Sequence, residues 1–405
     1  MMPLSKTDTL SFGAASKPIQ PRAFSLMIKP IGSVCNLRCA YCYYLEKAEL
    51  YSGHEPLMSS HTLEETIRQF FHAIEIPVAS FCWHGGEPLI AGKQFFREAI
   101  QLQNKYKGNI QVENSLQTNG TLIDAEWCDF FRENHFLIGL SLDGPETIHN
   151  GYRKDTTNKG SFSRTLRAAQ LMAEKHVDFN ILCTINALSA GKGKEIYRFL
   201  RNITPFVQFL PVGTPLPSSE TSHPTVTSKS PFAISGEEFG RFMCDVYDEW
   251  RKQDIGRIFV QLFDNTLALW CGQPSTLCST GELCGGSLTV EHNGDVYCCD
   301  HFVTKDHLLG NLLTTPLKDL YASPLLFDFS ASKFSHLPPV CRNCRWLFLC
   351  NGECPEHRTI STTTPSHPIN SLCEGYKMFF QHTESDMLRM RQLLSQGLPP
   401  AMINS

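Results

Sequence analysis

The sequence predicts an α/β protein in which helices wrap a parallel sheet, followed by a cysteine-rich C-terminal region. Between Ala23 and Val212, short apolar or β-branched runs closed by Gly, Pro or Asn alternate with helix-like stretches. Six such alternations favour a doubly wound sheet or a partial barrel, because consecutive parallel strands need helical crossovers. The 405 residues are enough for one large core or for two domains.

Each predicted strand is a short apolar run that ends in a turn-forming residue. The six runs are AFSLMIKP (23–30), ASFCWHGGEP (79–88), IQVENSLQTNG (110–120), FLIGLSLDGP (136–145), VDFNILCTIN (177–186) and PFVQFLPVG (205–213). The predicted helices cover 61–74, 93–106, 124–134, 161–176 and 236–253. Asp124 and Ser161 stand where N-caps are expected.

Composition and charge narrow the function classes. The chain is 42% hydrophobic and 19% charged, and its net charge of -4 gives no electrostatic reason to expect nucleic acid as a partner. Residues 1–22 are rich in Ser, Thr and Pro and lack the apolar core of a secretory signal, so we expect a flexible tail and a cytoplasmic protein. No run approaches the length of a membrane span. Residues 214–230 have the composition of an exposed loop.

Seventeen cysteines are the unusual feature of this composition. Their number is odd, and eleven of them lie between Cys244 and Cys373. Short spacings without an export signal favour metal or cluster ligation over a disulfide framework.

Three thiols converge directly after the first predicted strand, at Cys35, Cys39 and Cys42. Structural zinc sites and most iron–sulfur clusters have four protein ligands. Either a distant residue completes a zinc site, or one metal ion is left open. HGGEP, QTNG and SLDGP follow the next three strands, and the carboxyl ends of parallel strands share one edge. We therefore expect one site at this edge.

Eight more thiols near the C-terminus have the number needed for two four-ligand clusters, with a pair of zinc ribbons as the alternative. They are Cys278, Cys284, Cys299, Cys341, Cys344, Cys350, Cys354 and Cys373. Of the remaining six, Cys82, Cys128, Cys183 and Cys244 fall in strand or helix patterns and are expected in the core. Cys271 and Cys298 complete the count.

The CxxxCxxC spacing resembles the signature of the radical S-adenosylmethionine (SAM) enzymes, and HGGEP resembles their GGEP element. The resemblance implies a partial (β/α)6 TIM-like barrel over 23–235. It also implies that Cys35, Cys39 and Cys42 hold a 4Fe–4S cluster with one iron open to SAM. In such enzymes the backbone and carboxylate of GGEP hold the SAM amino group.

The C-terminal spacing, Cys284-x9-Gly294-x4-Cys299 followed by C-x2-C-x5-C-x3-C, resembles the SPASM domain. The resemblance implies such a domain over 236–380, a C-terminal helix or tail over 381–405, and two auxiliary 4Fe–4S clusters. Their ligands would interleave, with one cluster on Cys278, Cys284, Cys299 and Cys354 and the other on Cys341, Cys344, Cys350 and Cys373. A swap of Cys298 for Cys299 is open, but the spacing from Gly294 favours Cys299.

Across Ile28 to Tyr376 the chain is similar to the anaerobic sulfatase-maturating enzymes. The carrying segments are IKPIGSVCNLRCAYCYYLEK, HGGEPLIAG, NSLQTNGTLID, LIGLSLDGPETIHNGYRKD, FNILCTIN, GDVYCCDHFV and CNGECPEHR. The resemblance implies oxidation of a Cys or Ser side chain in a sulfatase polypeptide to formylglycine. It further implies three 4Fe–4S clusters, SAM, an unfolded sulfatase or peptide substrate, and an electron donor such as a flavodoxin or ferredoxin.

The same resemblance implies roles for single residues. Asp300 matches the proton acceptor, although a turn aspartate after a strand is the alternative. Tyr44, Gln117 and Asn119 fall on the substrate side, with a loop-capping role as the alternative for Asn119. The positions that match SAM contacts are Tyr41, Gly86, Glu87, Ser141, Arg153 and Gly213.

Two positions depart from the family pattern. His84 stands before GGEP where Gln is common, and Gln261 stands in IFVQLFD, a predicted strand before the first auxiliary cluster, where Arg is frequent. Both positions are expected to lie near the bound substrate. The main alternative function is therefore that of a SPASM enzyme that cross-links or otherwise modifies a ribosomal peptide. Such enzymes often carry a peptide-recognition domain before the barrel, and only 34 residues precede Cys35 here. A non-catalytic iron–sulfur or zinc scaffold would need neither GGEP nor Asp300.

Overall fold

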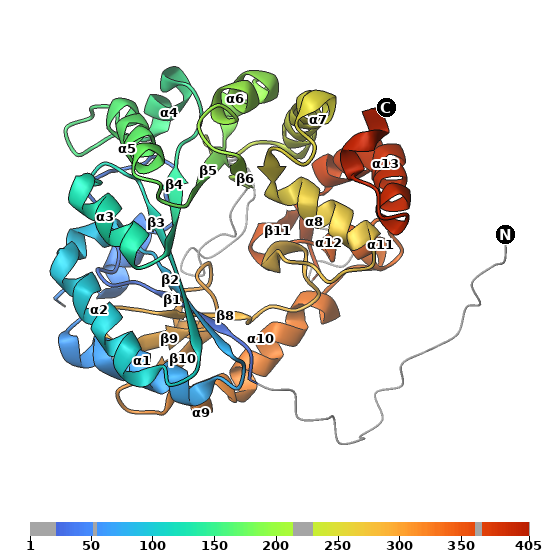
Figure 1. Cartoon of the computed structure of the whole chain (residues 1–405). Coiled ribbons are helices and arrows are strands. Elements are labelled where there is room, and N and C mark those ends of the chain that lie inside the picture. The colour runs from blue at the N-terminus through green and yellow to red at the C-terminus, as the bar shows by residue number, and fades with distance from the viewer. Residues whose placement is uncertain (1–21, 52–54, 214–229, 361–366, 405) are drawn as a thin grey trace, which may run out of the picture.

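The computed structural model describes residues 22–51, 55–213, 230–360 and 367–404. Nearly all of the predicted tail (1–22) and exposed loop (214–230) lies outside these residues. One ten-stranded sheet organises the fold, in the order β10-β9-β8-β1-β2-β3-β4-β5-β6-β7. It curves around a central space with helices on its outer side (Figure 1). The predicted α/β fold with a partial barrel is confirmed.

All six predicted strands are present, and neighbours pair in parallel. They are β1 (Ser25–Ile28), β2 (Val78–Trp83), β3 (Gln111–Thr118), β4 (Phe136–Ser141), β5 (Phe179–Ile185) and β6 (Phe206–Pro211). In β2 the buried residues Ala79, Phe81 and Trp83 alternate with half-buried ones. The buried set packs in the core beneath the helices, and the other set faces the barrel interior.

Seven helices follow the strands in this part of the described chain, and the sequence predicted all of them except those over 146–152 and 193–200. They are α1 (Ser60–Ala73), α2 (Gly92–Tyr106), α3 (Ala125–Glu133), α4 (Glu146–Tyr152), α5 (Phe162–Glu174), α6 (Gly193–Leu200) and α7 (Gly236–Gln253). Asp124 caps α3 by accepting a hydrogen bond from the Trp127 amide at 2.8 Å. The predicted cap at Ser161 is wrong, because its hydroxyl instead lies 3.0 Å from the Arg153 carbonyl oxygen and 2.9 Å from His149 Nε2.

The C-terminal region extends the barrel sheet. β8 (Ser287–Val290) pairs in parallel with β1, and β9 (Asp295–Tyr297) and β10 (Leu308–Asn311) follow it antiparallel. At the other edge β7 (Phe259–Val260) adjoins β6. The loop after β9, which carries Cys299 and Asp300, is thereby brought to the end of β1. This pairing was not part of the sequence prediction.

The remaining elements surround the C-terminal cysteines. They are α8 (Gln261–Trp270), α9 (Leu317–Tyr321), α10 (Pro324–Ser335), α11 (Pro339–Arg342), α12 (Leu347–Cys350), α13 (Cys373–Ser395) and the hairpin β11 (Arg358–Ile360) and β12 (Ile369–Asn370). The predicted boundary between residues 380 and 381 falls inside α13. Phe379 and Met390, on either side of it, pack in the same core, so this helix continues through the boundary.

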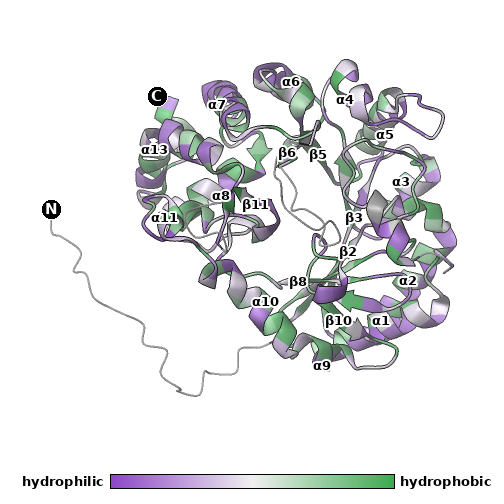
Figure 2. Ribbon diagram, turned by 180° about the vertical axis from the view of Figure 1, so that it is seen from behind, coloured by the Kyte–Doolittle hydropathy of each residue, from purple (hydrophilic) through white to green (hydrophobic). Residues whose placement is uncertain are grey.

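Two hydrophobic cores hold these layers together. One lies under β1–β4 and their helices and extends to β8 and α10, and the second joins β5 and β6 to α6, α7, α8 and α13. Figure 2 shows largely hydrophilic outer surfaces on peripheral helices such as α7 and α13. Among the described residues, no helix is long and apolar enough to cross a membrane.

Candidate functional site

The N-terminal thiols gather in the loop that follows β1. Burial raises the pKa of the Cys35 thiol to about 12, and the neighbouring Cys39 and Cys42 add to this. Burial likewise raises the pKa of Cys39 to about 11. The Cys35 and Cys39 thiols therefore resist ionisation, and a bound cation would compensate the charge of their thiolates beside the adjacent Cys42. The donor set therefore fits an iron–sulfur cluster.

The GGEP loop after β2 packs its backbone directly on the cysteine loop. The Gly86 amide donates to the Gly32 carbonyl oxygen at 2.8 Å, and the Glu87 amide donates to the Val34 carbonyl oxygen at 2.9 Å. A Cβ on Gly86 would lie only 1.9 Å from the Val34 oxygen. Only glycine permits this approach, so the backbone of the loop is brought beside the thiols.

The Glu87 side chain has a different environment from the one the sequence predicts. It is fully buried, and its carboxylate accepts hydrogen bonds from the Leu89 amide at 3.1 Å, from Thr118 Oγ1 at 2.8 Å and from the Asn119 amide at 2.8 Å. Burial raises its pKa to about 7, although the bonds from Asn119 and Thr118 oppose this. Each carboxylate oxygen is thus held by donors of the chain itself, and a contact of Glu87 with SAM stays a prediction. The carboxylate instead ties the end of β2 to the end of β3.

Glu87→Gln is therefore expected to destabilise the fold. A neutral amide has one acceptor oxygen and would turn its NH2 group toward a backbone or hydroxyl donor, at a cost of about 1–3 kcal/mol. Thermal unfolding without oxygen should show a lower Tm than the wild-type protein. Glu126→Gln, at a 61% exposed side chain, is the matched control. Equal Tm values for Glu87→Gln and wild type would refute this structural role.

Arg153, a predicted SAM contact, lies in a buried network with Tyr41. Arg153 Nε donates to Asp143 Oδ2 at 2.9 Å, and the Tyr41 hydroxyl donates to the same oxygen. Arg153 also reaches Thr184 Oγ1 at 3.2 Å and hydrogen-bonds Cys39. Sequence reasoning missed Asp143, although its position in SLDGP, directly after β4, was available as a signal. Asp143 orients the guanidinium beside the cysteine loop.

The other two predicted SAM contacts, Ser141 and Gly213, lie at the ends of their strands. Ser141 ends β4 and remains half-buried, close in sequence to Asp143. Gly213 follows β6, and a Cβ there would lie 3.0 Å from the His357 ring and 3.3 Å from Ser371 Oγ. Gly213 therefore lies against the C-terminal region, on a different side of the site from Arg153.

Of the two predicted substrate-side residues in QTNG, Asn119 is used by its own loop. Its Oδ1 accepts from the Thr121 amide at 2.9 Å, and its Nδ2 donates to Asn36 Oδ1 at 2.8 Å. This is the loop-capping alternative, and it also fastens the cysteine loop. Gln117 stays half-buried beside His84, to which it hydrogen-bonds. Gln261, assigned to a strand from sequence, is the first residue of α8.

Asp300 is a buried carboxylate with charged and polar partners. Lys29 forms a salt bridge with it, and the Tyr43 hydroxyl donates a hydrogen bond to it. Burial raises the pKa of Asp300, but the positive charge of Lys29, aided by His84 and His301, outweighs this and holds the pKa below its usual range. Tyr43 adjoins Cys42 in the chain, and Asp300 adjoins Cys299. The carboxylate therefore connects the N-terminal thiols to the C-terminal ones.

The neighbouring Tyr44 is also buried. Its hydroxyl donates to Glu291, which is fully buried at the end of β8. The sequence analysis missed Lys29, Tyr43 and Glu291, because their partners are far away in the chain.

The structure brings the eight C-terminal thiols together in the two predicted groups. Burial raises the pKa values of Cys278, Cys284 and Cys299, and each of them lies close enough to Cys354 for that thiol to raise its pKa further. The second group, Cys341, Cys344, Cys350 and Cys373, lines one pocket together with Trp346, Tyr376 and Phe380. Each group offers four soft donors at one place, which fits a 4Fe–4S cluster.

The other cysteines lie away from these groups or within the core. Cys298 is fully buried in the core beneath β8 and β9, whereas Cys299 is half-buried. Cys128 and Cys183 are fully buried as predicted, whereas Cys82 and Cys244 are half-buried.

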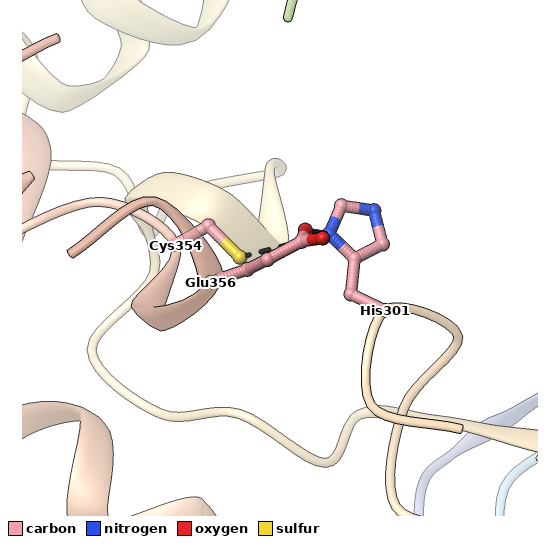
Figure 3. A group of neighbouring side chains, drawn as sticks. All are labelled: His301, Cys354 and Glu356. Carbon is pink, nitrogen blue, oxygen red and sulfur yellow. Dashed lines mark hydrogen bonds and ion pairs between the residues drawn. The ribbon is translucent and has the colours of Figure 1, made fainter. Parts of the chain in front are cut away.

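An ion pair borders the first C-terminal group. His301 contacts the Glu356 carboxylate, and its Nδ1 lies 3.9 Å from Cys354 Sγ (Figure 3). Burial lowers the pKa of His301, but Cys354 and Glu356 outweigh this and hold it above its usual value. The motifs CCDH and CPEH contain these residues, but neither spacing alone indicated that they meet.

The comparisons with known proteins define the class first. Residues 30–200 match the model of the Radical SAM superfamily, and residues 281–345 match the SPASM iron–sulfur cluster-binding domain. The chain is thus a radical SAM protein with a SPASM domain.

Relatives and solved structures define the family. The chain is 38% identical over 387 residues to the serine-type anaerobic sulfatase-maturating enzyme of Bacteroides thetaiotaomicron, which covers 93% of this chain and 94% of that protein. It is 34% identical over 363 residues to the cysteine-type enzyme of Clostridium perfringens, covering 88% and 95%. The structure of native anSMEcpe with bound AdoMet matches with a TM-score of 0.80 and 32% identity, covering 91% and 99%. This chain belongs to the anaerobic sulfatase-maturating enzymes.

A more distant match concerns the fold alone. Streptococcus suis SuiB bound to its precursor peptide SuiA is 16% identical, with a TM-score of 0.59, over 87% of this chain and 76% of that chain.

Proposed function

We propose that this protein oxidises a Cys or Ser side chain of a sulfatase polypeptide to formylglycine. Its family includes serine-type and cysteine-type maturating enzymes, and anSMEcpe has been solved with both AdoMet and the Cp18Cys peptide. The observation that carries the proposal is the Asp300 carboxylate, which hydrogen-bonds Tyr43 next to Cys42 and directly follows Cys299. A base is thus held between a radical-generating site and an electron acceptor.

Three groups of thiols would hold the cofactors. Cys35, Cys39 and Cys42 would bind a 4Fe–4S cluster with one iron open to SAM, and the two four-thiol groups would bind the auxiliary clusters. When bound, these groups supply radical hydrogen abstraction and a sink for one electron. Asp300 would take the proton that the substrate side chain loses. The proposed SAM contacts are Tyr41, the backbone at Gly86, Ser141, Arg153 and Gly213, with Glu87 shaping its loop from beneath.

The surroundings of the reaction are proposed on the same basis. Eleven cysteines would have to stay reduced to hold the three clusters, which supports a reducing, cytoplasmic setting. A small electron carrier such as a flavodoxin or ferredoxin would supply the reducing electron. An unfolded sulfatase segment would present the target side chain.

An anaerobic assay of reconstituted protein with SAM and dithionite tests the function. One peptide carries a C-x-P-x-R motif, and a second carries its serine version. Each is incubated separately, and its mass is measured by mass spectrometry. Aldehyde formation on either peptide is the expected result, and it also names the target side chain. Formation of 5′-deoxyadenosine with both peptides unchanged would overturn sulfatase maturation in favour of another peptide modification.

Loss of one auxiliary ligand should be visible in the iron content. Cys350→Ala is expected to lower it from about twelve to about eight irons per chain, because this cluster would need four thiols and has no SAM to take the place of the missing one. Cleavage of SAM should persist, since the thiols of the N-terminal loop are untouched. The half-buried Cys244, on α7, provides the control variant Cys244→Ala. An unchanged iron content in Cys350→Ala would contradict the proposed grouping.

A further inference from the structure

Lys29, immediately after β1, is an ammonium group buried inside the barrel. Its side chain is fully buried, and it ends among three groups from different parts of the chain. It forms the salt bridge with Asp300, its Nζ lies 2.7 Å from His84 Nδ1, and it lies 4.4 Å from the centroid of the Tyr44 ring. Burying an ammonium without partners is costly, so this arrangement of three partners is what makes the position tolerable.

The direction of these hydrogen bonds fixes the state of His84. An ammonium group carries donors only, so His84 Nδ1 accepts from Lys29. The Gly85 amide also donates to Nδ1, at 2.7 Å. Burial, followed by the charge of Lys29, lowers the pKa of His84 to about 4, so the ring is neutral. Its single proton therefore resides on Nε2, which makes Nε2 a hydrogen-bond donor.

In the family, a Gln side chain commonly stands at the position of His84. Neutral His84 offers the same kind of group as the amide of that Gln, an N–H donor. A Gln side chain would present an N–H donor there, and the neutral Nε2–H of His84 presents one as well. Lys29 and the Gly85 amide both donate to Nδ1 and together keep this tautomer, while Gln117 hydrogen-bonds the ring. Because Lys29 contacts both groups, it orients the Asp300 carboxylate and the His84 ring together.

We propose that Lys29 is a positioning residue that aligns the Asp300 carboxylate and the His84 ring for the same substrate side chain. The role rests on the proposed function, in which Asp300 receives the substrate proton. Lys29 does not itself contact a proposed cluster ligand or the substrate. Its loss should therefore leave the generation of the radical intact and impair the step that follows.

The test is the amount of aldehyde formed for each 5′-deoxyadenosine released. Lys29→Met keeps most of the buried volume and removes the donors. We expect iron content, cluster spectra and the KM for the peptide close to wild type. Aldehyde per 5′-deoxyadenosine should fall by about 10- to 100-fold, as expected when two charge-assisted hydrogen bonds are lost.

The chain provides a matched control at Lys93. This lysine also contacts two carboxylates, Asp124 and Glu126, and lies 5.6 Å from the centroid of the Trp127 ring, but on the outer surface of the barrel. Lys93→Met should retain the wild-type ratio of the two products. It controls for the loss of a paired lysine as such.

Chemical rescue separates positioning from a general structural role. In Lys29→Ala, ethylammonium should restore part of the lost coupling by supplying N–H donors in the vacated space, whereas tetramethylammonium at the same concentration should not. A wild-type product ratio in Lys29→Met would overturn the proposal, and so would a parallel loss of iron, SAM cleavage and aldehyde. Because aldehyde formation by the wild-type protein is measured separately, either of these results would leave the proposed function standing. If the wild-type protein forms no aldehyde, the proposed function and the positioning role of Lys29 are both refuted.

Discussion

Replacing Asp300 by Asn is expected to separate SAM cleavage from aldehyde formation. The amide keeps the size of the carboxylate and can still accept a hydrogen bond from Lys29 or Tyr43, so the site should assemble. It cannot receive the substrate proton, and removal of a general base typically costs 10²–10⁴-fold in rate. We expect 5′-deoxyadenosine to form at a rate near wild type, while formylglycine falls by about that factor. Both products are measured in the same anaerobic reaction.

The control for this variant is Asp306→Asn. Asp306 is an exposed aspartate on the segment that follows β9, a short distance from Asp300 in the chain. It should form both products at wild-type rates. If Asp300→Asn loses 5′-deoxyadenosine and formylglycine to the same extent, Asp300 is not a dedicated proton acceptor. The carboxylate would then serve mainly to compensate the buried charge of Lys29.

Cys35→Ala is expected to abolish both activities. Two remaining thiols, Cys39 and Cys42, are too few to hold a 4Fe–4S cluster that already lacks a fourth protein ligand. The auxiliary clusters should remain, so the iron content should fall to about eight per chain from about twelve. SAM cleavage with dithionite should drop below detection, because no open iron is left to bind and reduce SAM. Iron analysis and chromatography of 5′-deoxyadenosine provide the measurements.

Cys271→Ala serves as the comparison for this second variant. Cys271 follows α8, is half-buried, and belongs to none of the three thiol groups. It should retain full iron and both activities. Continued SAM cleavage by Cys35→Ala would show that the N-terminal loop is not the radical-generating site. That result would contradict the central assignment of cofactors to thiols.

Local patterns predicted the barrel well because its strands are short-range features. Apolar alternation followed by Gly, Pro or Asn located all six parallel strands, and the Asp124 cap follows from residue type and position alone. The prediction that the Ser161 side chain caps a helix failed because of tertiary contacts. Its hydroxyl found partners in Arg153 and His149 across the loop, and these compete with the helix amides.

The prediction that Gln261 lies in a strand was wrong for a related reason. IFVQLFD has a strand-like pattern, yet only Phe259 and Val260 pair with β6, and the chain then turns into α8. A short apolar run has the same appearance in a strand and in a buried helix, so packing decides between them.

Glu87 illustrates the limit of a resemblance. The GGEP motif correctly indicated a loop whose glycines allow close backbone approach, and Gly86 indeed packs against Val34. The motif did not indicate that the carboxylate would be enclosed by donors from Leu89, Thr118 and Asn119. Those donors come partly from the following strand, and a linear motif carries no information about them.

The sequence by itself determined the chemistry available to this protein: three closely spaced thiols after a first strand, eight more near the C-terminus, and six strands to carry the loops between them. These properties depend on residue type and on short spacings, and both can be read directly from the sequence. Only the tertiary structure decided how the parts meet. Because β8 pairs with β1, Asp300 reaches the buried Lys29, and Lys29 in turn contacts His84. Contacts between distant segments arise from sheet pairing and burial, so they exist only once the chain has folded.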